Sequence, residues 1–389
     1  MRIPPNKKTP KGVFFCLVLK QNRIVYNIYK EVITMNLYVN DYNIFVIVLV
    51  TFVVSAILIP VCKKISVHVG AVDVPDGKRK VHTKVMPRLG GLAIFASFLI
   101  GYMLFAPKTT QMLSILIGGF VIAFLGFIDD VKPLGPIPQF LGQLAAASIV
   151  VFYGNIIFSS MKIFGLSLSF GLFAYPLSLL FIVGIINAIN FVDGLDGLAG
   201  GTSIIYFITI AVIGYIMNKL AGLDVILCLI MIGSTLGFLL YNFHPASIFM
   251  GDIGSNFLGF IIAVIALLGF KTATITSLII PLLVLFVPLF DTVLAIGRRV
   301  LKGKSIGSSD KEHLHHQLLK KTKSVRKSVL LMYAINALFA CVSIFYTLGN
   351  KQQSMILYLV LLVLFAVLIF NTDILFEHTK KEGKKDGKN

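Results

Sequence analysis

The sequence predicts an all-α, polytopic integral membrane protein, built as a bundle of about eleven transmembrane helices. Composition is the first observation: 57% of the 389 residues are hydrophobic, 13% are charged, and the mean hydropathy is +0.90. Soluble domains carry about 25% charged residues. The second observation is that the apolar residues form separate long runs. The third is that basic residues gather in every other connection between those runs. Together these patterns favour a chain that crosses a bilayer many times over a soluble globular fold.

The apolar runs set the expected spans. Some runs are shorter than the ~20 residues that a perpendicular span requires, so their ends should extend into the adjoining loops. The count would fall to ten if one pair of runs formed a re-entrant segment. In chain order, the spans are expected near residues 43–61, 90–106, 111–128, 139–154, 172–189, 202–217, 225–241, 257–270, 277–296, 328–347 and 354–371.

The distribution of basic residues predicts the orientation. Residues 62–89 carry seven Lys or Arg, 297–327 carry ten and the C-terminal tail carries five, whereas each connection on the other side carries one lysine. Because basic loops stay in the cytoplasm, the first helix should enter from outside and the C-terminus should lie inside. The net charge of +18 is therefore a topology signal. With no groove-reading or RNA-binding motif beside it, it does not indicate a nucleic-acid partner.

We expect three parts: an N-terminal extension (1–34), a membrane domain (35–371) and a basic cytoplasmic tail (372–389). The extension holds seven Lys or Arg on the outer side, and its apolar piece GVFFCLVL is too short to span. No small-residue cleavage site follows that piece, as a signal peptide would require. We therefore expect Met35 to be the true start. The four cysteines are scattered, which predicts neither a disulfide framework nor a thiolate zinc site.

With this topology, the unusual polar clusters all fall on the cytoplasmic side, where we expect the active site. Asp129 and Asp130 end one predicted helix, Asp193 and Asp196 end another, and Asp252 precedes a third. Five carboxylates at one mouth would repel one another unless a cation binds there. Mg²⁺ typically takes one or two carboxylates together with substrate phosphates.

Glycines and basic residues extend this interpretation. Gly251 and Gly254 would let the backbone approach a ligand closely, and the helix after them would offer its N-terminal N–H groups to an anion. Lysines and arginines in the neighbouring loops can neutralise phosphate charge. An acidic metal site beside anion sites predicts a metal–diphosphate substrate.

Each acidic cluster also has a purely structural explanation, which the spacing leaves open. The pair Asp193 and Asp196 could cap helices, the adjacent pair 129–130 could lie in a solvated loop, and Asp252 could be an N-cap. Adjacent residues do not share a helix face, so the pair 129–130 would rarely supply both carboxylates to one metal. Asp291 is expected to be structural, paired with Arg298 or a polar neighbour.

Six motifs run in order from about residue 43 to about 320 and read DVPDGKRKVH, PRLGG, DD, NAINFVDGLDGLAGG, PASIFMGDIGS and HLHH. Taken together, these motifs resemble the polyprenyl-phosphate N-acetylhexosamine-1-phosphate transferase family, on its N-acetylglucosamine branch. This family includes bacterial enzymes that start teichoic-acid, O-antigen and enterobacterial-common-antigen chains, and the phospho-MurNAc-pentapeptide transferase of peptidoglycan synthesis is a relative. Only the N-terminal extension and the C-terminal tail lie outside the resemblance.

The resemblance implies a role for each matching residue. Asp252 and Asn190 would hold Mg²⁺, with Mn²⁺ as the alternative metal. Asp129 would be a candidate base at the lipid phosphate, and Phe249 would stack on uracil. The full implied catalytic set is Asp129, Asp130 and Asp193, and the implied substrate-binding set is Asp196, Phe249, Lys84, His313, His315 and His316.

The implied reaction transfers N-acetylglucosamine 1-phosphate from UDP-GlcNAc to undecaprenyl phosphate and releases UMP, in a multi-pass protein of the bacterial cytoplasmic membrane. UDP-GalNAc or another UDP-N-acetylhexosamine is an alternative donor, and a homodimer is left open. A transferase for MurNAc-pentapeptide is the nearest alternative, and a cation transporter is the alternative from another class. A transporter would need its carboxylates near the bilayer midplane.

The histidine loop bears on the donor. Relatives that carry MurNAc-pentapeptide typically show three consecutive histidines followed by an acidic residue, whereas here Leu314 interrupts the run and Gln317 follows it. Helical spacing predicts that His313 and His316 share one face while His315 points elsewhere. A zinc site is not expected, because no acidic or cysteine partner lies at metal-ligand spacing.

Overall fold

The structure is a computed structural model that describes residues 38–75, 84–163, 166–217, 220, 222–271, 285–301, 313–349 and 351–370. The predicted N-terminal extension, the proposed start at Met35 and the basic tail lie outside these residues.

Apart from three short hairpins and the connecting loops, the described chain is helical. A π-helical turn, Ile149–Tyr153, continues α6, and a 3-10 turn, Gly171–Phe173, precedes α7. The antiparallel hairpins pair β1 (Tyr38–Val39) with β2 (Tyr42–Asn43), β3 (Val72–Asp73) with β4 (Met86–Pro87), and β5 (Ser160–Ile163) with β6 (Leu166–Ser169). The helices are α3 (Ile44–Val69), α4 (Gly90–Phe105), α5 (Thr110–Val131), α6 (Pro136–Ser148), α7 (Ala174–Val192), α8 (Leu198–Ile216), α9 (Leu223–Asn242), α10 (Gly251–Lys271), α12 (Phe286–Leu301), α13 (Leu314–Thr322), α14 (Val325–Thr347) and α15 (Lys351–Phe370).

The prediction of a polytopic helical membrane protein is confirmed. Among the described residues, eight helices are long and apolar enough to cross a bilayer, and α4 and most of α15 are shorter apolar helices. Ten of the eleven predicted spans coincide with helices of the structure. The eleventh, 277–296, overlaps α12, and its first part lies outside the described residues. Several helices run past their predicted ends, as α3 and α10 do.

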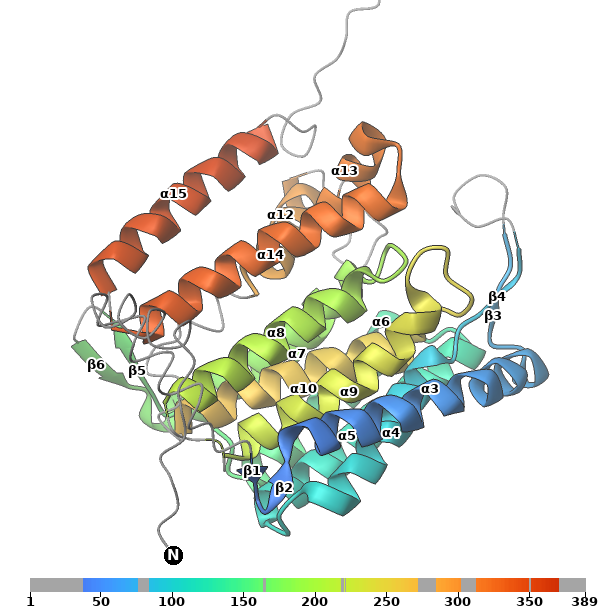
Figure 1. Ribbon diagram of the computed structural model, residues 1–389, viewed down its shortest axis with the longest axis horizontal. Coiled ribbons are helices and arrows are strands. Elements are labelled where there is room, and N and C mark those ends of the chain that lie inside the picture. Colours follow the sequence, from blue (N-terminus) through green and yellow to red (C-terminus); the bar gives the residue numbers. More distant parts are fainter. Residues whose placement is uncertain are drawn as a thin grey trace, which may run out of the picture.

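Helix α10 forms the centre of the bundle and contacts α4, α5, α7, α8 and α9 (Figure 1). In its most apolar stretch, 94% of the residues are buried, whereas the share is 22% in α3, which lies at the outside of the bundle. Glycines permit this close packing. A Cβ on Gly91 of α4 would overlap the backbone of Gly254, and a Cβ on Gly126 of α5 would overlap that of Ile253. Small residues at such contacts let helices approach closely within a membrane.

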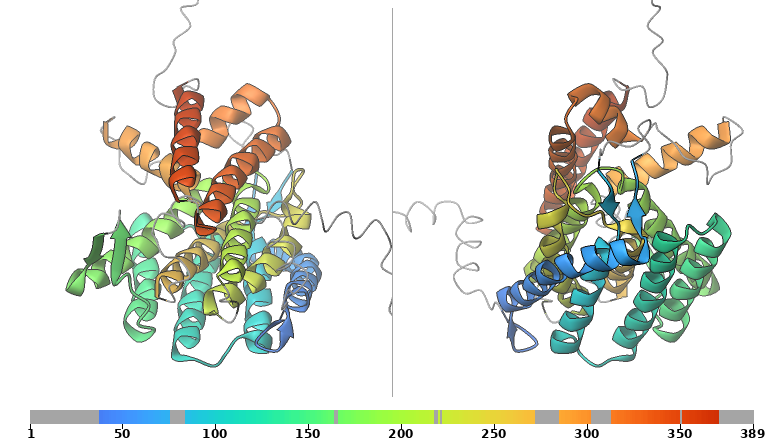
Figure 2. Two further views of the ribbon diagram at one scale, coloured as in Figure 1. Left: turned by 60° about the vertical axis from the view of Figure 1, so that its left-hand side comes forward. Right: turned by 90° about the vertical axis from the view of Figure 1, so that its right-hand side faces the viewer.

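The C-terminal helices add an outer layer to this bundle. Helix α14 packs along α8, and α15 contacts α14 (Figure 2). Large apolar side chains on α15 and α3, such as Leu359, Val363 and Ile57, are exposed. Outward-facing residues of this kind suit contact with lipid tails, where exposure of apolar surface carries no hydrophobic penalty.

One end of the bundle gathers the polar residues. The C-terminal ends of α5, α7 and α9 meet there with the N-terminal ends of α10 and α14, beside the β3–β4 hairpin and α13 (Figure 1). This is the end on which the sequence places the basic connections. The expectation that the acidic clusters share one side is therefore met by the fold.

Candidate active site

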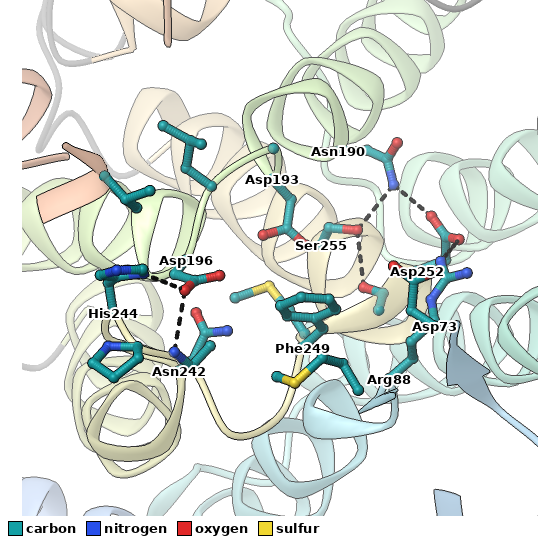
Figure 3. Close-up of a pocket in the computed structure, with 18 of the residues that line it drawn as sticks. Asp73, Arg88, Asn190, Asp193, Asp196, Asn242, His244, Phe249, Asp252 and Ser255 are labelled. Carbon is teal, nitrogen blue, oxygen red and sulfur yellow. Dashed lines mark hydrogen bonds and ion pairs between the residues drawn. The ribbon is translucent and has the colours of Figure 1, made fainter. Parts of the chain in front are cut away.

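A cavity of about 780 Å³ opens at this end of the bundle. Small-molecule sites typically measure about 300–1,000 Å³, so the cavity suits a nucleotide sugar in size. Figure 3 shows side chains from α7, α10, the loop after α9 and the β4–α4 connection converging on it. Seven of the predicted site residues line the cavity, namely Lys84, Asn190, Asp193, Asp196, Phe249, Asp252 and His316.

The two predicted metal ligands lie side by side. Asp252 is the second residue of α10, and its Oδ1 accepts a hydrogen bond of 2.7 Å from Nδ2 of Asn190, near the end of α7. The same amide nitrogen donates to Oγ of Ser255 at 2.9 Å. The other carboxylate oxygen of Asp252 lies 3.3 Å from Nη2 of Arg88. Asp252 is therefore within the helix rather than its N-cap.

Asp130 lies behind the cavity wall and closes the N-terminus of α10. Its carboxylate accepts hydrogen bonds from the backbone N–H of Asp252 at 3.0 Å and of Ile253 at 3.2 Å. Two of the N–H groups predicted to bind a ligand anion are therefore already taken by a carboxylate of the protein. Gly251 begins the helix with a φ of 72°, and a Cβ there would overlap the carbonyl oxygen of Arg88.

Asp129 points in a different direction from Asp130, as expected for neighbours on a helix. Its Oδ1 accepts a 2.5 Å hydrogen bond from the backbone N–H of Leu134, and its carboxyl group also interacts with that of Asp252. Both residues of the pair are buried inside α5. The solvated-loop explanation for this pair is therefore wrong. Neither residue lines the cavity, but Asp129 interacts with Asp252, which does.

Asp193 follows the last turn of α7 and contributes a carboxyl group to the cavity wall. Burial raises its pKa to about 7, and the nearby charge of Asp252 acts in the same direction, while Arg88 opposes them. Crowded carboxylates of this kind disfavour one another's charge unless a cation is present. A pKa raised by burial and a specific neighbour inside a cavity is typical of functional sites.

Asp196 fixes the loop that leads into α10. Its Oδ2 lies 2.7 Å from Nδ1 of His244 and accepts a 3.1 Å hydrogen bond from the backbone N–H of Ala246. The N-cap of α8 is Gly197, so Asp196 is not a helix cap, whereas Asp193 is the C-cap of α7. On the other side of the loop, Nε of Arg326 donates to the carbonyl oxygen of His244 at 2.9 Å.

Phe249 is held in the cavity by its own backbone. Its N–H donates to the carbonyl oxygen of Pro87 at 2.8 Å, and its carbonyl oxygen accepts from Gly90 N–H at 2.9 Å. These bonds join the loop after α9 to the strand before α4. The ring projects into the cavity between the Asp196 and Asp252 sides (Figure 3).

The three histidines have three different environments. Nδ1 of His313 lies 3.0 Å from Oδ2 of Asp291, whose Oδ1 accepts the backbone N–H of Leu314 at 2.9 Å. His315 is buried against Gly194, and His316 lines the cavity. The prediction that His313 and His316 share a ligand-facing side is therefore wrong, because His313 precedes α13 and points to Asp291. Asp291 pairs with a polar neighbour, as expected.

The structure adds cavity residues that sequence reasoning missed. Arg88, Asn242, His244 and Ser255 line the cavity, and none was singled out. Arg88 lies inside the PRLGG motif, and His244 immediately precedes the PASIFMGDIGS motif. A lone arginine or histidine has no spacing pattern of its own. Such a residue can be recognised as part of the site only when the fold brings distant segments together.

The donor set fits a magnesium ion bound together with a substrate. Among the described residues, no three His, Cys, Asp or Glu side chains form a cage that could hold a metal alone. The cavity nevertheless offers the carboxylate oxygens of Asp252, with the amide nitrogen of Asn190 turned toward one of them and the carboxyl groups of Asp129 and Asp193 interacting with Asp252. A half-turn of the Asn190 amide would present its oxygen to a cation there. Mg²⁺ usually binds through one or two carboxylates and completes its shell with water and phosphate oxygens.

Comparisons with known proteins agree with the site. Residues 112–270, which run from α5 to α10, match the model of glycosyl transferase family 4. A probable undecaprenyl-phosphate N-acetylglucosaminyl 1-phosphate transferase of Bacillus subtilis is 44% identical over 330 residues, covering 83% of this chain and 90% of that protein.

More distant relatives carry related names. A decaprenyl-phosphate N-acetylglucosaminephosphotransferase of Mycobacterium tuberculosis is 34% identical, covering 72% of this chain and 77% of that protein. An undecaprenyl-phosphate alpha-N-acetylglucosaminyl 1-phosphate transferase of Escherichia coli O157:H7 is 29% identical, covering 75% and 81%. The chain therefore belongs to the polyprenyl-phosphate N-acetylglucosamine-1-phosphate transferases, a family of membrane enzymes within glycosyl transferase family 4.

Proposed function

We propose that this enzyme transfers N-acetylglucosamine 1-phosphate from UDP-GlcNAc to undecaprenyl phosphate, forming undecaprenyl-diphospho-GlcNAc and UMP. The observation that carries the proposal is that Asp252, Asn190 and the Phe249 ring line one cavity at the basic end of the bundle. The relatives, which are named as transferases of N-acetylglucosamine 1-phosphate to polyprenyl phosphates, support the substrate class.

The reaction exchanges one phosphorus–oxygen bond for another. An oxygen of the lipid phosphate attacks the β-phosphorus of the donor, and the bond from that phosphorus to the UMP oxygen breaks. A phosphate monoester has its second pKa near 6, so the acceptor is largely dianionic at about pH 7 and needs no strong base. Catalysis of such a transfer rests mainly on positioning and electrostatic stabilisation.

Each part of the cavity has a place in this scheme. Asp252 and Asn190 would hold Mg²⁺, which when bound neutralises charge on the diphosphate and on the departing UMP. Phe249 offers a ring face for uracil, and the partly buried Asp193 and Asp196 flank it. Lys84 and His316 supply polar groups for the diphosphate and the sugar. Asp129, whose carboxyl group interacts with Asp252, is the proposed base at the lipid phosphate.

The basic end would face the cytoplasm of a bacterial cell, because Lys and Arg concentrate in the connections there. The donor would then enter from the cytoplasm and the lipid from the membrane. The product would start a surface glycan such as teichoic acid or an O-antigen.

The test offers purified enzyme equal concentrations of UDP-GlcNAc, UDP-GalNAc and UDP-MurNAc-pentapeptide with undecaprenyl phosphate and Mg²⁺. UMP release and the mass of the lipid product are followed. We expect the GlcNAc lipid to dominate, and omission of either Mg²⁺ or the lipid to abolish UMP release. Preferential formation of the pentapeptide lipid would reassign the donor. No UMP from any donor would overturn the proposal.

A further inference from the structure

Arg88 bridges two carboxylates at the cavity wall. Its Nη2 lies 3.3 Å from Oδ1 of Asp130 and 3.3 Å from Oδ2 of Asp252. The side chain of Asp130 is fully buried, whereas that of Asp252 is 22% exposed and reaches the cavity. The guanidinium group therefore supplies positive charge at the point where the buried acidic groups meet the open space.

The backbone of Arg88 is fixed while its side chain is accessible. The Arg88 N–H donates to the carbonyl oxygen of Ala71 at 3.0 Å and to Oγ of Ser66 at 3.0 Å. The carbonyl oxygen packs against Gly251, where a Cβ would overlap it. The side chain is 32% exposed and lines the cavity. A rotation of the side chain alone would move the charge, because nothing in the main chain needs to shift.

The two carboxylates depend on Arg88 to different degrees. Asp130 also accepts two backbone N–H groups of α10, so much of its charge is compensated without the arginine. The other side-chain partners of Asp252 are the neutral amide of Asn190 and the carboxyl group of Asp129, and neither supplies positive charge. A divalent cation on Asp252 would therefore replace the charge that Arg88 supplies there. Two cations at one carboxylate oxygen would repel each other, so binding of one weakens the other.

We propose that Arg88 is an exchangeable counter-ion. Its guanidinium neutralises Asp252 while no divalent cation is bound, and it turns to the diphosphate of the donor once Asp252 takes the cation. The proposal rests on the proposed function for the identity of the donor. Arginine suits the position at the diphosphate because its planar fork of N–H donors matches a pair of phosphate oxygens, and it stays charged in both positions.

The test compares wild-type protein with Arg88→Gln in detergent, in two separate titrations. The first measures Mn²⁺ binding by electron paramagnetic resonance with no nucleotide present. The second measures UDP binding at saturating Mg²⁺. We expect Arg88→Gln to bind Mn²⁺ roughly tenfold more tightly and UDP roughly tenfold more weakly, as suits one charge-assisted hydrogen bond. A merely structural role for Arg88 would weaken both.

Lys132→Gln is the matched control. Lys132 is exposed at the C-terminal end of α5, two residues from Asp130, and does not line the cavity. The Lys132→Gln substitution removes one positive charge without removing a partner of the carboxylates, so both titrations should stay near wild type. Arg88→Lys keeps the charge but loses the fork, so its Mn²⁺ affinity should stay near wild type while UDP binding weakens. If Arg88→Gln does not fold, this variant carries the test.

Two outcomes would overturn the proposal. One is unchanged or weaker Mn²⁺ binding in Arg88→Gln, and the other is an equal gain in Lys132→Gln, which would reduce the effect to general charge. Unchanged UDP binding in both Arg88 variants would overturn the claim that Arg88 turns to the diphosphate. The Mn²⁺ titration needs no turnover, so failure of the transferase assay with wild-type protein would count against the proposed function alone.

Discussion

The imidazole ring of His315 packs directly against Gly194, so that a Cβ at position 194 would overlap Nε2 of the histidine. The contact joins α13 to the turn that carries Asp193 and Asp196. His315 is 1% exposed and stands beside His316, with ring centroids 4.3 Å apart. Asp291 holds the start of the same helix through Leu314 N–H. A helix far along the chain thereby supports the acidic turn of the cavity.

The first prediction concerns this contact. Gly194→Ala should lower both the melting temperature and the transferase rate, because overpacking costs about 1–3 kcal/mol. In a His315→Ala background the added methyl group has room, so the extra cost of Gly194→Ala should fall below about 0.5 kcal/mol. Gly184→Ala is the control, since a Cβ there meets no atom within 4 Å. Additive losses in the double variant would show that the two residues do not press on one another.

The second prediction concerns the metal. Asp252→Ala should remove most of the activity while the protein still inserts and folds, and Asp252→Asn should be nearly as damaged. A lost ligand takes away charge stabilisation that is needed in the transition state. The rate is measured against Mg²⁺ concentration with saturating substrates. Asp196→Asn removes the same charge beside His244 and should raise the KM for the donor without changing the Mg²⁺ requirement. Near wild-type turnover of Asp252→Ala at limiting Mg²⁺ would refute the ligand assignment.

The third prediction separates the adjacent carboxylates. Asp130→Asn should lower the melting temperature more than Asp129→Asn does, because Asp130 accepts two backbone N–H groups and the Arg88 guanidinium. A weakened buried network of this kind costs about 1–3 kcal/mol. Asp129→Asn should instead lower turnover more than donor affinity. Thermal unfolding and steady-state kinetics of both variants check this. Weaker nucleotide binding with unchanged turnover in Asp129→Asn would misplace its role.

The fourth prediction concerns acid stability. Burial lowers the pKa of His315 to about 3, and the neighbouring His316 acts in the same direction, while Asp291 opposes them and His313 adds to the lowering. The unfolded side chain titrates near 6.5, so it takes up a proton that the folded one refuses. The stability from neutral His315 is therefore present above about pH 6.5 and is lost as the pH falls toward about 3.

The measurement is the melting temperature of wild type and His315→Gln between about pH 7.5 and 5, over which the wild type should lose about 2 kcal/mol through this group. The glutamine variant should show a shallower fall. Parallel curves for the two proteins would mean that another group sets the acid response.

Much of the helical fold could be predicted from local sequence. Transmembrane spans depend on runs of apolar residues, and the side on which each loop lies depends on its basic residues. Ten spans and the gathering of acidic motifs at one end followed from these patterns. Helix ends were less accurate, as for α10, which begins at Gly251 rather than near 257.

What the sequence by itself determined is therefore the membrane class, the succession of helices and seven of the residues that line the cavity. Only the tertiary structure decided the partner of each charged group. Asp130 takes the N–H of Asp252, which lies 122 residues away, and Arg88 bridges both. The physical reason is that hydropathy acts along the chain, whereas a hydrogen bond depends on which helix end packs beside which. Glycine contacts such as Gly91 with Gly254 set that packing.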